Sequence, residues 1–215
     1  MSESEKDFIP AAGHDRLLWL YDPLTRLLGA DRVRSKLLDS ARIGAGERVL
    51  DLGCGTGALA LLLARREPGA RIVGLDPDAK ALARAKEKAE RADVAIEWRQ
   101  GYAGRAPFAP HSFDRVISSL VIHHLASEEK RAAFRDAKRL LRPGGSFHLL
   151  DFGPPGSRFE RALTSLFHHD ARVQDNLRGL LPEWLREAGF ADASEVESHR
   201  TLFGRVSVYA ARVSG

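Results

Sequence analysis

The chain has 215 residues, of which 44% are hydrophobic and 29% are charged. These proportions are those of a folded globular protein, and the length suits one large α/β domain with small additions. No apolar run approaches the ~20 residues that cross a bilayer, so we expect no stable membrane insertion. The single cysteine, Cys54, excludes an internal disulfide or a thiolate zinc cluster and favours a reducing, cytoplasmic location. The net charge of +4 raises the question of a nucleic-acid partner.

Residues 1–43 are predicted to form a helical N-terminal cap. After a polar tail over residues 1–10, apolar residues recur at helical spacing and are interrupted at Asp22-Pro23, which indicates two or three short helices. Gly44-Ala45-Gly46 breaks this pattern. We therefore expect the main domain to cover residues 44–215.

Strands and helices alternate along residues 48–152. The predicted strands are 48–52, 71–75, 94–98, 113–119 and 146–152, and the predicted helices are 58–66, 79–92 and 127–141. Ser127 is the expected N-cap of the last helix, and residues 99–110 have the composition of a loop. Such alternation predicts an α/β fold with a doubly wound, parallel sheet that binds ligands at the carboxyl ends of its strands.

The tail of the chain departs from this alternation. Helices are predicted at 158–169 and 182–188, and strands at 193–199 and 204–212. The short turn between these two strands permits an antiparallel pair and excludes a crossover helix. The complete prediction is a mostly parallel, seven-stranded sheet with an antiparallel last strand, in which residues 153–185 form a lid-like insertion.

A glycine-rich segment, Asp51-Leu52-Gly53-Cys54-Gly55-Thr56-Gly57, follows the first predicted strand. Glycines at the turn from a strand into a helix let a ligand approach the backbone and the free N–H groups of the helix start. Asp76 ends the second strand about 20 residues further on, the spacing at which an acid accepts from ribose hydroxyls. A tight turn without a ligand is the simplest alternative. The Gly-x-Gly-x-Gly spacing and Asp51 disfavour a dinucleotide, because a carboxylate repels pyrophosphate and attracts an ammonium group.

These segments resemble the motifs of the class I S-adenosylmethionine-dependent methyltransferases. Residues 49–60 resemble the first motif of that family, 72–76 the second and 113–125 the fourth. Residues 139–150, with Arg142-Pro143-Gly144-Gly145, resemble the segment that leads into its fifth strand. Within the family, the sequence is most similar to the type 11 group, which includes the ubiquinone and menaquinone biosynthesis methyltransferases.

The resemblance implies S-adenosyl-L-methionine as cofactor and S-adenosyl-L-homocysteine as product. Asp51 and the backbone at Gly53 would face the amino and carboxylate ends of the methionyl group, and Asp76 would hold the ribose hydroxyls. Tyr102 replaces an aspartate that often binds the adenine, so its ring or the neighbouring backbone would contact that base. The residues expected to bind the cofactor are Asp51, Gly53, Cys54, Gly55, Asp76, Pro77, Tyr102, Ala103, Ser119 and Leu120.

Three residues are candidates for a direct part in catalysis. His123 and His124 follow the fourth predicted strand, where an imidazole could orient the acceptor or take its proton, with packing at a helix start as the alternative. Tyr21 resembles the tyrosine of an element that caps the cofactor in the type 11 group, or its ring packs beneath the N-terminal helices. His168-His169-Asp170 makes a poor metal site, because neighbouring helical side chains point about 100° apart, and we expect no metal.

The expected reaction is methyl transfer by direct displacement to a small, lipophilic or aromatic molecule. Ser118-Ser119-Leu120-Val121 lacks the Asn/Asp-Pro-Pro-Tyr element of the family members that methylate planar amides and nucleobase amines, which disfavours DNA as the acceptor. The surplus basic residues, Lys130 among them, lie on predicted helices in the pattern of a solvated face, so we expect no nucleic-acid partner. A domain that binds the cofactor without catalysis, and less favourably an NAD(P)-dependent oxidoreductase, are the alternatives. A homodimer is one option for the assembly.

Overall fold

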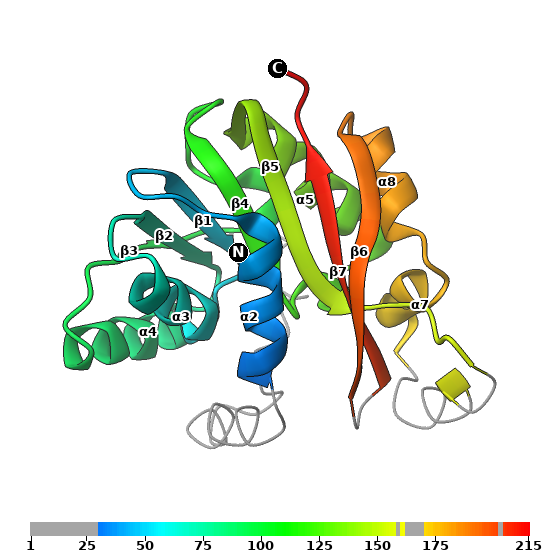
Figure 1. The fold of residues 1–215 in the computed structure, drawn as a ribbon, viewed down its shortest axis with the longest axis horizontal. Coiled ribbons are helices and arrows are strands. Elements are labelled where there is room, and N and C mark those ends of the chain that lie inside the picture. The colour runs from blue at the N-terminus through cyan, green and yellow to red at the C-terminus, as the bar shows by residue number, and fades with distance from the viewer. Residues whose placement is uncertain (1–29, 158–159, 162–169, 202–203) are drawn as a thin grey trace, which may run out of the picture.

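Seven strands form one sheet in the order β3-β2-β1-β4-β5-β7-β6 (Figure 1). A computed structural model of the protein describes residues 30–157, 160–161, 170–201 and 204–215. The strands are β1 (Arg48–Leu52), β2 (Arg71–Asp76), β3 (Glu97–Gln100), β4 (Phe113–Ser119), β5 (Leu141–Phe152), β6 (Ala191–Thr201) and β7 (Gly204–Arg212). Strands β1 to β5 pair in parallel, and β7 is antiparallel to both of its neighbours. The predicted sheet with its antiparallel last strand is confirmed.

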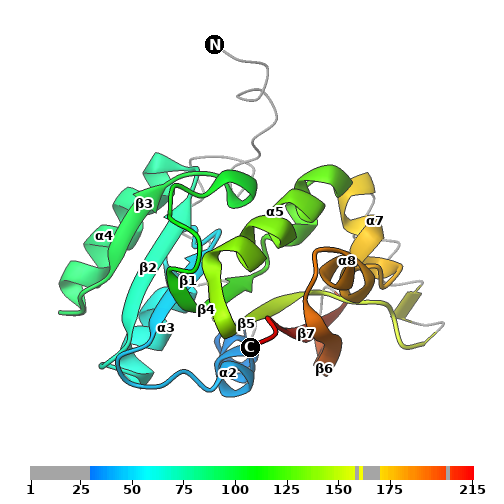
Figure 2. The same cartoon turned by 90° about the horizontal axis from the view of Figure 1, so that it is seen from above.

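Helices cover both faces of the sheet, with α2 and α3 on one side and α5 and α8 on the other (Figure 2). The helices are α2 (Ala30–Ala41), α3 (Ala58–Arg66), α4 (Ala79–Arg91), α5 (Ser127–Leu140), α7 (Ala171–Leu177) and α8 (Leu181–Glu187), with 3-10 turns η3 (Ala103–Arg105) and η4 (Ile122–His124). Turn η3 lies in a stretch that we expected to be only a loop. None of the described helices is long and apolar enough to span a membrane.

The sheet separates two apolar cores. Leu50 and Leu52 of β1 belong to the core under α5 and α8, whereas Val49 belongs to the core under α2 and α3. Successive side chains of a strand point to opposite faces. Asp51, two residues after Val49, therefore points toward the face that α2 and α3 cover.

Helix α2 runs against the direction of the parallel strands. Near its C-terminus, the Ala41 carbonyl accepts a hydrogen bond from Nε of Arg115 at the start of β4 (3.3 Å). Its N-terminal turns therefore lie toward the carboxyl ends of the strands, which is the edge where open α/β sheets bind ligands.

Two predicted strands begin at residues that differ from the observed ones by three or more. The third strand begins at Glu97, not at Val94, because the Val94 N–H donates to the Ala89 carbonyl (3.1 Å) and so closes the end of α4. The fifth strand begins at Leu141 rather than at residue 146, because Leu141 already pairs with the start of β4.

Ser127 is not the N-cap of α5, contrary to the prediction. The cap position is Ala126, whose N–H donates to the Glu129 carboxylate (2.8 Å). Ser127 is the first helical residue, and its hydroxyl donates instead to Asp175 of α7 (2.7 Å). Helix α7 itself was not predicted, and the helix expected at 158–169 lies almost wholly outside the described residues.

His148 joins α2 to β5 from a buried position. Its Nδ1 is 2.9 Å from the Ser40 hydroxyl, and its Nε2 is 2.9 Å from the Ser146 hydroxyl. Burial, helped by the charges of Arg115 and Arg212, lowers the pKa of this imidazole to about 4. The fold therefore contains the neutral ring.

We expect His148→Gln to reduce the acid sensitivity of the fold. The unfolded imidazole gains a proton as the pH falls below about 6.5, but the folded one stays neutral until about 4. Wild-type stability is therefore lost across this window, by ~2 kcal/mol between about pH 7 and about pH 5. Urea unfolding of both proteins at the two pH values measures the difference, and equal losses would contradict the assignment.

Candidate functional site

The glycine-rich loop after β1 is tied to the end of β2 by main-chain contacts. The N–H groups of Gly53 and Cys54 both donate to the Leu75 carbonyl, at 2.8 and 3.0 Å. The N–H of Gly55 donates to the Asp76 carboxylate (2.8 Å). Two strand ends are thus held together at the edge where a ligand is expected.

Gly55 presents bare backbone at this loop. Its φ is 51°, and a side chain built there would meet no atom within 4 Å. At Gly53 the added Cβ would lie 2.5 Å from Val121, and at Gly57 it would lie 2.7 Å from Trp98. Of the three glycines, Gly55 is therefore the one over which a ligand could lie.

Asp76 is a buried carboxylate whose oxygens can accept further hydrogen bonds. It is 8% exposed, and its Oδ1 accepts from the Asp78 N–H (2.9 Å) while its Oδ2 accepts from Gly55. Burial raises the pKa of Asp76, and these two backbone N–H groups oppose the rise. Each carboxylate oxygen has a further lone pair. Asp76 can therefore accept from a pair of neighbouring hydroxyls.

Asp51 is more deeply buried, at 1% exposure. Its Oδ2 accepts from the Ala60 N–H in the first turn of α3 (3.1 Å). Burial raises the pKa of Asp51 to about 7, although the charge of Arg34 and the Ala60 N–H oppose the rise. A bound ammonium group would favour the ionised form of this carboxyl.

The residues predicted beside the adenine lie at the ends of β2 and β3. Nε2 of Gln100 donates to the Pro77 carbonyl (3.0 Å) and joins the two strand ends. Tyr102 follows, and the guanidinium carbon of Arg105 lies 4.6 Å from the centre of its ring. Ala103 begins η3. One face of the Tyr102 ring is therefore occupied by a cation.

The end of β4 combines an unusual backbone with an unsatisfied hydroxyl. Ser118 Oγ donates to the Leu52 carbonyl (2.7 Å), which fixes β4 against β1. Leu120 has a φ of 58°, rare for a leucine, and its N–H donates to the Leu150 carbonyl (2.8 Å). The Ser119 hydroxyl is buried and has no hydrogen-bond partner among the described residues. Both features are typical of functional sites.

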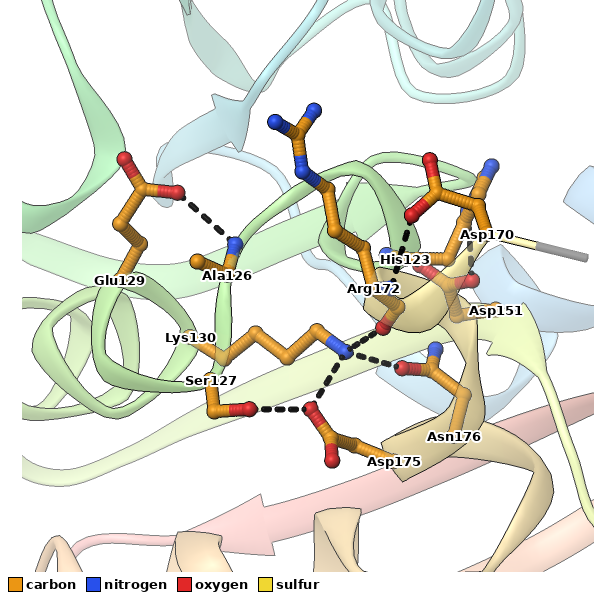
Figure 3. Close-up of polar contacts among 10 residues, drawn as sticks. All are labelled: His123, Ala126, Ser127, Glu129, Lys130, Asp151, Asp170, Arg172, Asp175 and Asn176. Carbon is orange, nitrogen blue, oxygen red and sulfur yellow. Dashed lines mark hydrogen bonds and ion pairs between the residues drawn. The ribbon is translucent and has the colours of Figure 1, made fainter. Parts of the chain in front are cut away.

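A histidine and an aspartate pair at the ends of η4 and β5 (Figure 3). The Oδ1 of fully buried Asp151 is 2.8 Å from Nδ1 of His123, and its Oδ2 accepts from the His123 N–H (3.3 Å). Burial alone would raise the pKa of Asp151, but the interactions with His123 and the Phe152 N–H lower it overall. Because Asp151 holds Nδ1, the other ring nitrogen of His123 is directed away from the acid, as in a general base.

His124 lies outside this pair. It is exposed, and its ring centre is 4.0 Å from that of His123. Sequence reasoning missed the pair of His123 and Asp151, because its members are 28 residues apart. Within the described ranges, no three His, Cys, Asp or Glu side chains gather where they could hold a metal ion. Tyr21 and His168-His169 fall outside those ranges.

Lys130 anchors α7 beside the pair (Figure 3). Its predicted place on a solvated face is wrong, because it is 0% exposed. Its Nζ donates to the Arg172 carbonyl, to Oδ2 of Asp175 (3.2 Å) and to Oδ1 of Asn176 (2.9 Å). Burial lowers the pKa of Lys130, whereas Asp175 opposes the change. The anchored helix begins after Asp170, whose side chain accepts a hydrogen bond from the Arg172 N–H (2.8 Å).

One signal for this burial was present in the sequence. Lys130 precedes Ala133 and Phe134, two core residues of α5, by three and four positions. Side chains at that spacing share one face of a helix. The apolar stripe of α5 therefore includes Lys130.

Lys130→Met is expected to loosen α7. It leaves the oxygens of Arg172, Asp175 and Asn176 without their buried donor, and removing one partner of a buried ion pair costs about 3–5 kcal/mol. Hydrogen exchange should accelerate in α7, and urea unfolding should show the lower stability. Arg135→Met removes an exposed cation from the same helix and should change stability by less than about 0.5 kcal/mol. Equal behaviour of the two variants would argue against the anchor.

The chain is similar in sequence to known methyltransferases. Residues 49–145 match the family model described as a methyltransferase domain. The demethylmenaquinone methyltransferase of Thermus thermophilus is 41% identical over 138 residues, which cover 63% of this chain and 62% of that protein. The erythromycin 3''-O-methyltransferase of Saccharopolyspora erythraea is 33% identical over 185 residues, which cover 77% and 57%. The chain thus spans less than two thirds of either relative.

Solved structures share the fold. Phosphoethanolamine N-methyltransferase 2 of Haemonchus contortus, solved in complex with S-adenosyl-L-methionine, superposes with a TM-score of 0.68 at 20% identity. The match covers 86% of this chain and 53% of that one. At this level of identity the likeness establishes a common Rossmann-like architecture.

Proposed function

Because this chain belongs to the class I S-adenosylmethionine-dependent methyltransferases, we propose that it transfers a methyl group from S-adenosyl-L-methionine to a small, lipophilic or aromatic molecule. One observation carries the proposal. The loop in which the Gly55 N–H donates to Asp76 lies at the same edge of the sheet as the pair of His123 and Asp151. The first is suited to a ribose-containing cofactor, and the second to an acceptor that must lose a proton.

The described residues fit this cofactor. The open space over Gly55 admits a ligand close to the backbone, and Asp76 has acceptors for both ribose hydroxyls. The carboxylate of Asp51 suits the ammonium group of the methionyl end. Pro77 and the backbone at Tyr102 are our candidates for the adenine, since Arg105 already covers one face of the Tyr102 ring.

The chemistry divides between the cofactor and the chain. When bound, S-adenosyl-L-methionine supplies a methyl group that is attached to a positively charged sulfur. This sulfur leaves as a neutral thioether. Nε2 of His123 takes the proton from the methyl acceptor, because Asp151 holds Nδ1 and stabilises the imidazolium that forms. Ser119 and Leu120, next to η4, would line the path between acceptor and cofactor.

We favour an acceptor with a hydroxyl or an acidic C–H group, because a histidine base is useful only where a proton leaves. Relatives of the chain are named for demethylmenaquinone and for the 3'' oxygen of erythromycin, and both names fit this class. We retain a small-molecule partner, a cytoplasmic location and no nucleic-acid partner as parts of the proposal. A homodimer stays an option for the assembly.

Asp76→Ala is expected to weaken the binding of S-adenosyl-L-homocysteine by about tenfold or more, because hydrogen bonds to a charged group contribute about 1.5–3 kcal/mol. Isothermal titration calorimetry measures the change. Glu87→Ala removes an exposed acid from α4 and should leave the affinity unaltered. Failure of the wild-type protein to bind this ligand would refute the proposed function.

His123→Gln is expected to lower kcat by about 10²–10⁴-fold with little change in cofactor affinity, because an amide cannot take the proton. The acceptor is first identified by mass spectrometry of a cell extract, as the compound that gains the mass of one methylene group. His124→Gln should lose less than about tenfold, because His124 is outside the acid pair. A wild-type rate for His123→Gln would exclude the assigned base.

A further inference from the structure

Arg172, in the first turn of α7, has a fixed main chain and an unpaired side chain. Its N–H donates to the Asp170 carboxylate (2.8 Å), and its carbonyl accepts from Nζ of Lys130. Its guanidinium makes no hydrogen bond or ion pair with any residue in the part of the chain that the structure describes. In Figure 3 this group points away from Nζ of Lys130. Arg172 is therefore held in place while its charge stays available.

The contact that fixes Arg172 comes from a fully buried cation. Lys130 is 0% exposed, and a buried ion pair is weak evidence for a gain in stability, because taking the charges out of water opposes their attraction. The Nζ group reaches three oxygens of α7, of which the Arg172 carbonyl is one. What this cluster does provide is a defined position for the first turn of α7, and so for Arg172.

Arg172 lies at the acceptor end of the site. Helix α7 packs against η4, the turn that carries His123 and His124. Partial desolvation lowers the pKa of His124, and the positive charge of Arg172 adds to this change. The ring centre of His124 is 4.0 Å from that of His123. The unpaired guanidinium therefore belongs to the surroundings of the proposed base.

The neighbouring acids already have donors from the chain itself. Three aspartates are close enough for their charges to act on Lys130. Their donors are His123 for Asp151, Lys130 and Ser127 for Asp175, and the Arg172 N–H for Asp170. Arg172, in contrast, has no acceptor for its guanidinium among the described residues. A ligand can supply that acceptor.

Phe152 adds an aromatic surface beside the same imidazole. Its half-buried ring meets that of His123 edge to face, with the ring centres 4.9 Å apart and an interplanar angle of 79°. Aromatic rings prefer this geometry and the offset stack when they pack against one another. The acceptor end of the site thus combines aromatic rings with one cation.

We propose that Arg172 binds a carboxylate of the methyl acceptor, which is then an aromatic or lipophilic acid. This inference rests on the proposed function and narrows its acceptor. A guanidinium binds a carboxylate through two parallel hydrogen bonds, and one cation matches a singly charged carboxylate better than a doubly charged phosphate. The carboxylate anchors the molecule while its hydroxyl or acidic C–H group lies at Nε2 of His123. Arg172 is a specificity-determining residue.

The test sorts acceptors by charge and removes the cation. The small molecules of a cell extract are separated at about pH 7 on an anion-exchange resin, which retains carboxylates because they are ionised there. The retained and unretained pools are each incubated with S-adenosyl-L-methionine that carries a labelled methyl group. The proteins are the wild type, Arg172→Met, Arg172→Lys and Arg178→Met. Arg178 is exposed at the C-terminal cap of α7 and serves as the matched control.

The wild type and Arg178→Met should label a compound of the retained pool that survives treatment with alkaline phosphatase. With that compound purified, Arg172→Met should raise KM about tenfold to a hundredfold, the loss expected for a charge-assisted hydrogen bond. Its kcat should change by less than about threefold, because Arg172 contacts the acceptor away from the reacting atoms. Arg172→Lys should keep part of the affinity. S-adenosyl-L-homocysteine should bind all four proteins equally.

Three results would overturn the assignment. One is label in the unretained pool only, which needs no variant and so does not depend on how the variants fold. The others are a wild-type KM in Arg172→Met and an acceptor that phosphatase destroys. Label in neither pool instead refutes the proposed function.

Discussion

The candidate site depends on the shared use of one main-chain oxygen, the carbonyl of Leu75. It accepts from two consecutive N–H groups of the loop after β1, and so fixes that loop against the end of β2. This contact brings the carboxylates of Asp51 and Asp76 to one place and turns the bare backbone of Gly55 outward. Because it involves only backbone atoms, it depends on the strand register rather than on any side chain.

The two halves of the site are held by different forces. The half around Gly55 and Asp76 is fixed by main-chain hydrogen bonds between neighbouring parallel strands. The half around His123 is fixed by buried polar side chains, through Asp151 behind the imidazole and Lys130 beneath α7. Such contacts are costly when one partner is lost, so the second half is more sensitive to substitution.

Local patterns predicted the sheet, the loop and the carboxylate of Asp76, because strand alternation, glycine spacing and strand ends are properties of short segments. Contacts between distant segments were not predictable in this way. The pair of His123 and Asp151 required the neighbouring positions of β4 and β5, and the burial of Lys130 required α7, which had no clear signal of its own. The boundary of β3 was misjudged because Val94 belongs to the end of a helix rather than to the apolar alternation.

The two halves of the site are held by different contacts, so they can change independently as such proteins diverge. The turn η4 and helix α7 lie outside the ladder of the sheet, so sequence changes there leave the strand pairing at Leu75 intact. Under the proposed function, changes in these two short segments would alter the acceptor while the methyl donor stays the same. The names of the relatives, one for demethylmenaquinone and the other for erythromycin, agree with that route.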